Sequence, residues 1–118
     1  MERAEGIVST EQFRDALIER LQVTAREPRL GILTDFTSGK LDTRGLEMRA
    51  LGHMLTGMPE RFQARRWAVA AREGTFTYGM FRMLAAYTAN SRIPLALFDD
   101  AESAIARLTE FSSENGRA

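Results

Sequence analysis

Three short apolar runs, each long enough for one β-strand, are separated by stretches whose apolar residues recur at helical spacing. The runs cover residues 30–36, 66–71 and 94–98. Near-continuous apolar runs of this length are typical of strands that are buried on both faces of a parallel sheet. Strands that alternate with helices form the βαβ pattern, which implies right-handed crossover connections. We therefore expect an α/β fold with a small, mainly parallel sheet and helices packed on it.

Four helices are expected to alternate with these runs, the first of them before residue 30. The first begins at Ser9-Thr10-Glu11-Gln12, a capping box in which Ser9 and Gln12 each satisfy the other's free amide. The expected caps of the other three are Asp42, Thr75 and the pair Asp99–Asp100. The apolar stripes expected to face the core are Met80, Met83, Leu84 and Tyr87 in the third helix, and Ala101, Ala104, Ile105 and Leu108 in the fourth.

The length of 118 residues fits one ordinary domain. We expect a single domain over 1–118, with an ordered core of about 6–111 and a polar tail over 112–118. Residues 1–8 could add a fourth strand, although their apolar residues stand among charges.

Composition excludes several classes of protein. Sixteen basic and sixteen acidic residues cancel, which argues against binding to nucleic acid or to an anionic membrane surface. No apolar run approaches the roughly 20 residues of a membrane span. Cysteine is absent and His53 is the one histidine, so thiolate and His-pair metal sites cannot be built within one subunit. We expect no cofactor and no metal, and a cytoplasmic location, because the first residues form no apolar leader and the lack of cysteine fits a reducing compartment.

Two segments of the C-terminal half carry a family resemblance. They are Tyr78-Gly79-Met80-Phe81-Arg82-Met83 and the stretch from Pro94-Leu95-Ala96-Leu97-Phe98 through Asp99-Asp100-Ala101-Glu102-Ser103-Ala104. In this order and spacing they resemble the bacterial SpoIIAA-like, or STAS-like, domains, which are grouped with sulfate-transporter and anti-sigma-factor-antagonist modules. The resemblance covers roughly residues 6–109 and implies a small α/β sandwich that works through protein–protein contact.

The chain departs from that family in two places. Family members usually open with a β-hairpin before the segment that matches Glu5-Gly6-Ile7-Val8, and this chain starts inside that hairpin. Many members also carry a Trp near the end of the last helix, where this chain has Arg107-Leu108.

The resemblance also suggests a phosphorylation site. Asp42-Thr43-Arg44-Gly45 occupies the place of the antagonists' Asp-Ser-Ser-Gly-like turn, whose first Ser is phosphorylated by a partner kinase. Thr43 would then need an exposed hydroxyl at the start of a helix over 43–57, with helix amides and Arg44 facing the phosphate. The alternative is more common in helical proteins: Asp42 is an N-cap, and Thr43 is an ordinary first-turn residue.

Four further residues form a candidate ligand or partner site. Asp35 and Thr37 stand at the carboxyl end of a predicted strand, where open α/β sheets bind ligands. Tyr78 and Arg82 lie one helical turn apart, so a phenol and a cation could together bind an anion. The alternatives are that Asp35 forms a turn and that the Arg82 stem packs on an aromatic ring.

No nucleophile, base and orienting group come together in the sequence, so no catalytic residues are assigned. We expect a non-enzymatic regulatory or protein-interaction module, as the resemblance implies, with an unidentified protein partner. A homodimer is expected, because a small sheet leaves an unpaired strand edge. The alternative is a protein or enzyme that binds a small anionic or lipid ligand in the crevice near Asp35 and Tyr78. A deep apolar cavity with convergent polar groups would favour that alternative, and a flat apolar patch would favour the interaction module.

Overall fold

The computed structural model describes residues 2–27, 31–58 and 67–116. Its strands are β1 (Glu2–Arg3), β2 (Gly6–Ser9), β3 (Ile32–Asp35), β4 (Gly39–Asp42), β5 (Trp67–Ala70) and β6 (Leu95–Phe98). Its helices are α1 (Thr10–Arg26), α2 (Gly45–Thr56), α3 (Phe76–Thr88) and α4 (Ala101–Gly116). The predicted strand ends Leu30 and Arg66 lie outside the described residues.

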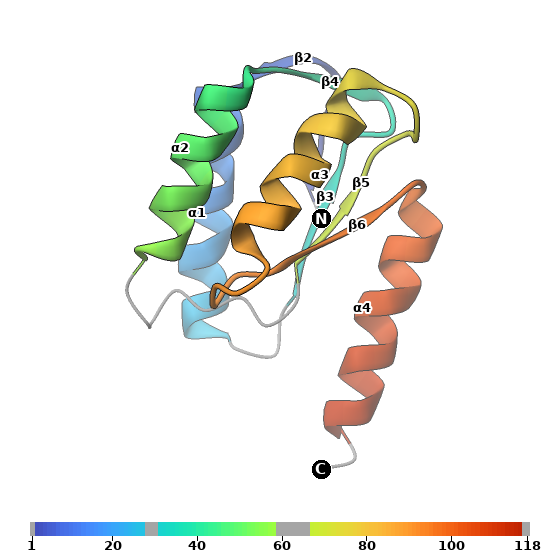
Figure 1. Cartoon of the computed structure of the whole chain (residues 1–118). Coiled ribbons are helices and arrows are strands. Elements are labelled where there is room, and N and C mark those ends of the chain that lie inside the picture. Colours follow the sequence, from blue (N-terminus) through green and yellow to red (C-terminus); the bar gives the residue numbers. More distant parts are fainter. Residues whose placement is uncertain (1, 28–30, 59–66, 117–118) are drawn as a thin grey trace.

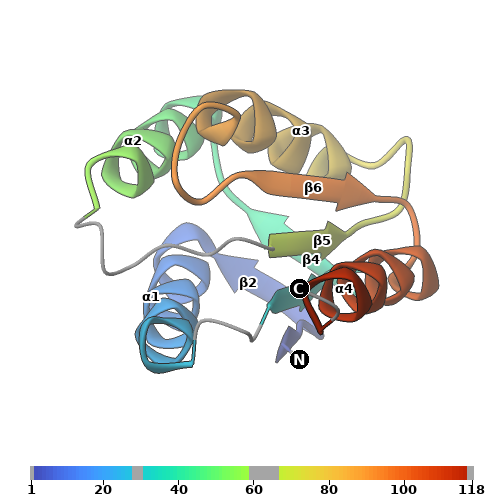
Figure 2. The same cartoon turned by 90° about the horizontal axis from the view of Figure 1, so that it is seen from below.

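Four of the strands form one parallel sheet in the order β1-β3-β5-β6. The order advances in one direction, and right-handed crossovers that advance in one direction place every connecting helix on the same face. Helices α1, α2 and α3 accordingly share one face, while α4, which follows the last strand, covers the opposite face (Figures 1 and 2). The expected α/β fold with a small parallel sheet and packed helices is confirmed.

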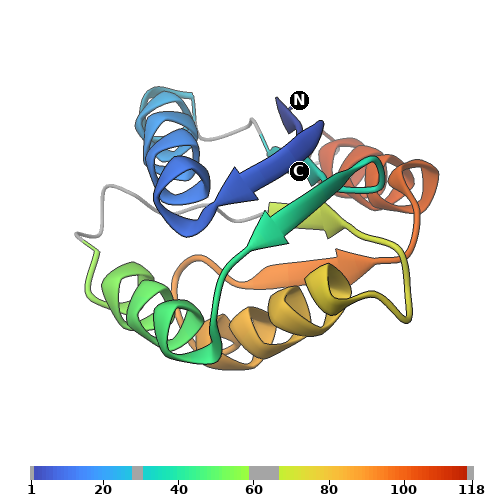
Figure 3. The same ribbon diagram turned by 90° about the horizontal axis from the view of Figure 1, so that it is seen from above.

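The remaining two strands, β2 and β4, pair in parallel as a second small sheet across the upper end of the molecule (Figures 1 and 3). Residues 1–8 were considered as a fourth strand despite their weak pattern, and the structure places all of β1 and most of β2 there. Strand β4 was not expected, because its residues lie between the predicted strand over 30–36 and the helix that Asp42 was expected to cap. A Cβ atom on Gly39 would lie 2.8 Å from the carbonyl oxygen of Ala4. Glycine therefore permits the close approach with which β4 begins.

The larger part of the core lies between the sheet and helices α1 to α3. Four aromatic residues from three elements and the turn after β3 meet there. Phe81 of α3 packs against Phe13 of α1 at 5.3 Å between ring centroids, and against Phe36 at 5.0 Å. The ring of Trp67 stacks on Phe13 at 6.4 Å. These contacts fasten α1 and α3 to the sheet.

The opposite face is built from small residues. Ala68 and Ala70 of β5 are buried against Ala104 of α4, with Leu33 of β3 beside them. Small side chains on both sides let the helix lie close over the sheet. The expected stripe of α4 is only partly correct, because Ile105 is exposed. The backbone of α4 continues to Gly116, through residues that were expected to form a polar tail.

The face of α3 that packs inward differs from the expected stripe. Leu84 is fully buried as predicted, but Tyr87 is 42% exposed, and two threonines at the ends of the helix, Thr77 and Thr88, are buried. The Thr77 hydroxyl accepts a hydrogen bond from the Leu41 amide at 3.0 Å, which satisfies its polar atom inside the protein. Periodicity of apolar residues cannot reveal a stripe whose ends are hydrogen-bonded threonines.

Three of the expected helix caps are present. Ser9 and Gln12 form the capping box at α1, Thr75 accepts the Tyr78 amide, and Asp100 accepts the Ser103 amide. The expectation that Asp42 caps α2 is wrong, because Asp42 is the last residue of β4 and the helix begins two residues beyond Thr43.

Candidate functional site

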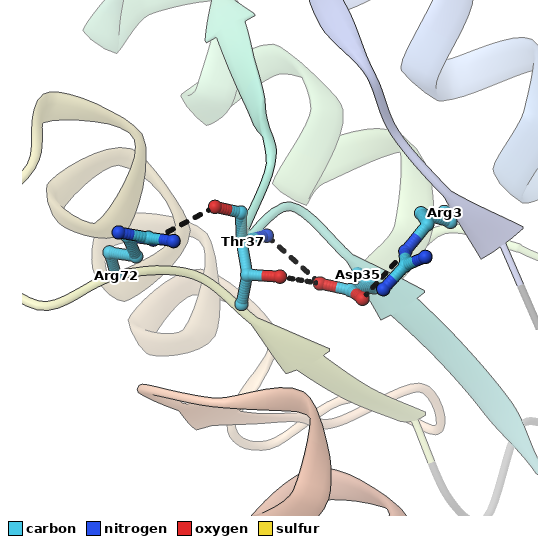
Figure 4. Close-up of polar contacts among 4 residues, drawn as sticks. All are labelled: Arg3, Asp35, Thr37 and Arg72. Atoms are coloured by element: carbon cyan, nitrogen blue, oxygen red, sulfur yellow. Dashed lines mark hydrogen bonds and ion pairs between the residues drawn. The ribbon is translucent and has the colours of Figure 1, made fainter.

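Asp35 lies at the carboxyl end of β3, as predicted, and its carboxylate is enclosed by hydrogen bonds. The Oδ1 atom accepts the Thr37 hydroxyl at 2.6 Å and the Thr37 amide at 2.9 Å. The Oδ2 atom lies 3.4 Å from Nε of Arg3 in β1 (Figure 4). The Asp35 side chain is only 1% exposed, so the interpretation of Asp35 as a turn-forming residue is the one that the geometry supports.

The environment of Asp35 favours its ionised form. Burial by itself would raise the pKa of this carboxyl, but the two hydrogen bonds from Thr37 and the Arg3 guanidinium together lower its pKa below the ordinary value of 3.8. Asp35 is therefore a charged, fully engaged group that holds β1, β3 and the following turn together.

The same turn forms one wall of an open groove. Arg72, in the connection after β5, donates from Nε to the carbonyl of Thr37 at 3.0 Å (Figure 4). Both residues line a hollow with a volume of about 820 Å³. We call it the strand-end groove, and its lining residues are Ile7, 36–42, Arg72 and 75–77.

Two large apolar side chains of the strand-end groove face solvent. Ile7 of β2 is 74% exposed, and Phe76 at the start of α3 is 61% exposed. Ile7 pairs in register with Lys40, whose side chain is also exposed, so the outer surface of the β2–β4 pair carries both an apolar and a cationic group. Figure 3 shows these two strands at the upper end of the molecule, with the helices lying to their sides and behind them.

Three threonine hydroxyls of the groove are committed to the fold. The Thr37 hydroxyl donates to Asp35, and the Thr77 hydroxyl accepts the Leu41 amide. The Thr75 hydroxyl donates to the Arg72 carbonyl at 2.6 Å while it caps α3. Each hydroxyl therefore stabilises a turn, a strand or a helix end.

The structure does not bring the four predicted ligand residues together. Thr37 lines the groove, but Asp35 is buried behind it, and neither Tyr78 nor Arg82 contributes to the lining. Tyr78 packs partly against the core, and Arg82 is exposed on α3. The strand-end groove is therefore not the crevice near Asp35 and Tyr78 that the alternative of a small-ligand site requires. Doubly wound sheets open a ligand crevice at the point where their strand order reverses. The order β1-β3-β5-β6 of the described strands has no such reversal.

Thr43, the candidate phosphoacceptor, does not have the exposed hydroxyl that the phosphorylation hypothesis requires. Thr43 is 6% exposed, and its hydroxyl accepts from the Thr10 hydroxyl at 2.6 Å and lies 3.3 Å from the Glu47 carboxylate. Glu47 also accepts the Arg44 amide at the start of α2. Thr43 therefore joins α1 to α2, and the expectation of an exposed acceptor hydroxyl there is wrong.

The Asp42-Thr43-Arg44-Gly45 segment as a whole has a structural explanation. Asp42 ends β4, Arg44 is the N-cap residue of α2, and Gly45 begins that helix 3.7 Å from Met83, measured from the position a Cβ would take. Sequence reasoning missed Ile7, Lys40, Arg72 and Phe76 as groove residues. Their one sequence signal is that Ile7 and Phe76 are apolar residues outside every predicted core stripe.

Comparisons of the chain with models of protein families, with curated proteins and with solved structures find no match. Among residues 2–27, 31–58 and 67–116, no group of three or more acidic or histidine side chains could hold a metal ion. No helix within the same ranges is long and apolar enough to cross a membrane.

Proposed function

We propose that this chain is a non-enzymatic regulatory module that acts in the cytoplasm by binding another protein through the strand-end groove. The observation that carries the proposal is the exposure of Ile7 and Phe76 on one open groove. Single exposed apolar residues are common, but two large ones on the same hollow are typical of surfaces that bind a partner.

The charges beside these residues indicate the chemistry of the partner. Lys40 and Arg72 line the groove together with Asp42, so cations outnumber anions among its charged lining residues. A partner segment that presents an apolar side chain next to an acidic one would match both features. The resemblance to STAS-like domains supports the same class of function, since that family works through protein contact.

The groove's polar chemistry supports binding over catalysis. The threonine hydroxyls that line it bond to Asp35, Leu41 and Arg72, and the Asp35 carboxylate is itself buried. A hydroxyl nucleophile needs a general base that is not already engaged in holding a turn. An open, partly apolar groove whose threonine hydroxyls are engaged is suited to a protein segment.

We also propose that the module is a homodimer. In the described part of the chain, β1 forms one edge of the main sheet, and β4 is the one strand paired with β2. An unpaired strand edge can add a strand from a second copy across a two-fold axis. Light scattering over a dilution series tests this: a mass of two chains that falls on dilution is expected, and a strict monomer at high concentration would contradict it.

The binding proposal is tested by affinity capture from native lysate with mass spectrometry. The bait proteins are the wild type, the double variant Ile7→Asp/Phe76→Asp, and the control Ile105→Asp, which changes an exposed apolar residue on α4. We expect a protein captured by the wild type and the control but lost with the double variant. Equal capture by all three proteins, or no specific capture by any, would contradict the proposal. Circular dichroism establishes that each bait is folded.

A further inference from the structure

A second hollow lies on the other side of Phe36, between helix α1 and the strands β1, β2 and β3. Its volume is about 260 Å³. Phe36 lines both this hollow and the strand-end groove. We call it the α1 cavity, and its lining residues are Arg3, Ala4, Glu5, Val8, Gln12, Phe13, Ala16, Leu17, Arg20, Ile32, Thr34 and Phe36.

The inner walls of the α1 cavity are apolar. Phe13 and Leu17 of α1 face Ile32 of β3 and Phe36, and all four are buried side chains of the main core. Apolar walls of this kind hold the hydrocarbon part of a ligand, because the transfer of an apolar group out of water is favourable. Among the described residues, β1 pairs only with Thr34 and Asp35, so Ile32 has Trp67 of β5 on one side and no strand partner on the side of the cavity.

The charged residues of the lining are two arginines and one glutamate, so cations outnumber anions. Arg3 of β1 and Arg20 of α1 contribute to the cavity, together with the single carboxylate of Glu5 and the amide of Gln12. The Nε atom of Arg3 is directed at Asp35, and its side chain is 57% exposed. Two arginines at the rim of a hollow with apolar inner walls are suited to a carboxylate or phosphate group, which guanidinium binds through paired hydrogen bonds.

We propose that the α1 cavity binds a small amphipathic anion, with its apolar part against Phe13 and Ile32 and its anionic group near Arg3 and Arg20. This site is separate from the strand-end groove and does not depend on the protein-binding proposal. An engineered apolar cavity of roughly 150 Å³ accommodates benzene. The α1 cavity therefore has room for one aromatic ring with a short chain that ends in an acid.

The chain contains a built-in reporter for the α1 cavity. Trp67 is the single tryptophan, its ring stacks on Phe13, and its Nε1 donates to the hydroxyl of Thr34 at 3.2 Å. Both of those partners line the cavity. A ligand that enters it should therefore change the fluorescence of Trp67, whereas a ligand in a distant site should not.

Three probes of nearly equal size separate the effect of charge from that of shape: 3-phenylpropionate, 3-phenylpropan-1-ol and 3-phenylpropylamine. Calorimetric titration measures affinity, and Trp67 fluorescence reports the place of binding. We expect saturable binding of the acid, about tenfold weaker binding of the alcohol, and weakest binding of the cationic amine. Equal affinity for all three probes, or no saturable binding of the acid, would overturn the proposal.

Two variants place the site. Ala16→Phe fills the cavity from helix α1 and should abolish binding of the acid, while its control Ala86→Phe, at an exposed position of α3, should bind like the wild type. Arg20→Gln should lower affinity for the acid about tenfold and leave affinity for the alcohol unchanged. Full binding by Ala16→Phe, or an equal loss for acid and alcohol in Arg20→Gln, would overturn the proposal.

Discussion

The Oδ1 atom of Asp35 accepts two hydrogen bonds from Thr37, one from its hydroxyl at 2.6 Å and one from its amide at 2.9 Å. These bonds close the turn through which the chain leaves β3. They also fix the Thr37 carbonyl at the place where Arg72 binds it. A buried carboxylate thus positions one wall of the strand-end groove without itself reaching the groove.

Replacement of this carboxylate should destabilise the protein. Asp35→Asn removes the charge that strengthens the bonds to Thr37 and Arg3, and we expect a loss of about 1–3 kcal/mol in the free energy of unfolding. Urea denaturation measures it. The control Asp42→Asn changes an exposed carboxylate and should stay within about 0.5 kcal/mol of the wild type. Equal stability of Asp35→Asn and the wild type would show that the turn does not need the charge.

The stability that Asp35 supplies should depend on pH in a defined direction. Its pKa in the folded protein is lowered from the ordinary 3.8, so the unfolded chain binds the proton more readily. The contribution is therefore complete above about pH 4 and is lost as the pH falls through the folded pKa. Denaturation of the wild type and Asp35→Asn is measured between pH 7 and pH 3. The difference between their free energies of unfolding should be constant from pH 7 to about pH 4 and should shrink below that pH. A difference that grows on acidification would contradict the sign of this pKa shift.

Leu84 should be one of the positions at which truncation costs most. Its side chain is fully buried between α3 and the sheet, so Leu84→Ala leaves a cavity and should cost about 2–5 kcal/mol. The matched control is Leu46→Ala, since Leu46 is 79% exposed on α2, and it should cost less than about 0.5 kcal/mol. Thermal or urea denaturation distinguishes them, and similar losses in both variants would contradict the assignment of the α3 core face.

Two helical glycines should respond in opposite ways to alanine. A Cβ on Gly52 of α2 would lie 2.6 Å from Cβ of Tyr87, so Gly52→Ala must push α2 and α3 apart and should cost about 1–3 kcal/mol. A Cβ on Gly79 of α3 would meet no atom of another element within 4 Å, so Gly79→Ala should stabilise the protein by about 0.5–1 kcal/mol. Stability curves of the two variants give the comparison. Stabilisation by Gly52→Ala would mean that α2 and α3 are farther apart at this position than the structure shows.

The strands of the main sheet were predictable where burial on both faces gave a continuous apolar run. All four residues of β5 are buried, and all four of β3, and both strands lie within the predicted runs. Strand β4 gives no such signal, because Leu41 is its one buried residue and its neighbours Lys40 and Asp42 are charged. Its place depends on pairing with β2, more than thirty residues away, and local pattern cannot reveal that pairing.

The candidate site was predicted only in part for a similar reason. Asp35 and Thr37 were found because the end of a strand could be located in the sequence. Ile7 and Phe76 come from elements whose proximity depends on the second sheet, so their shared groove follows from tertiary structure alone. Asp42 and Thr43 were expected at a helix start because acidic and hydroxyl residues cap helices so often.

Photo-crosslinking in the native host determines whether the strand-end groove binds a protein partner. The photoreactive residue p-benzoylphenylalanine replaces Phe76 in one variant and the exposed Ile105 of α4 in a second. We predict a crosslinked species of defined mass from the position of Phe76 and none of that mass from the position of Ile105. No crosslink from the position of Phe76, or the same species from both positions, would contradict the proposal that the strand-end groove binds a protein partner.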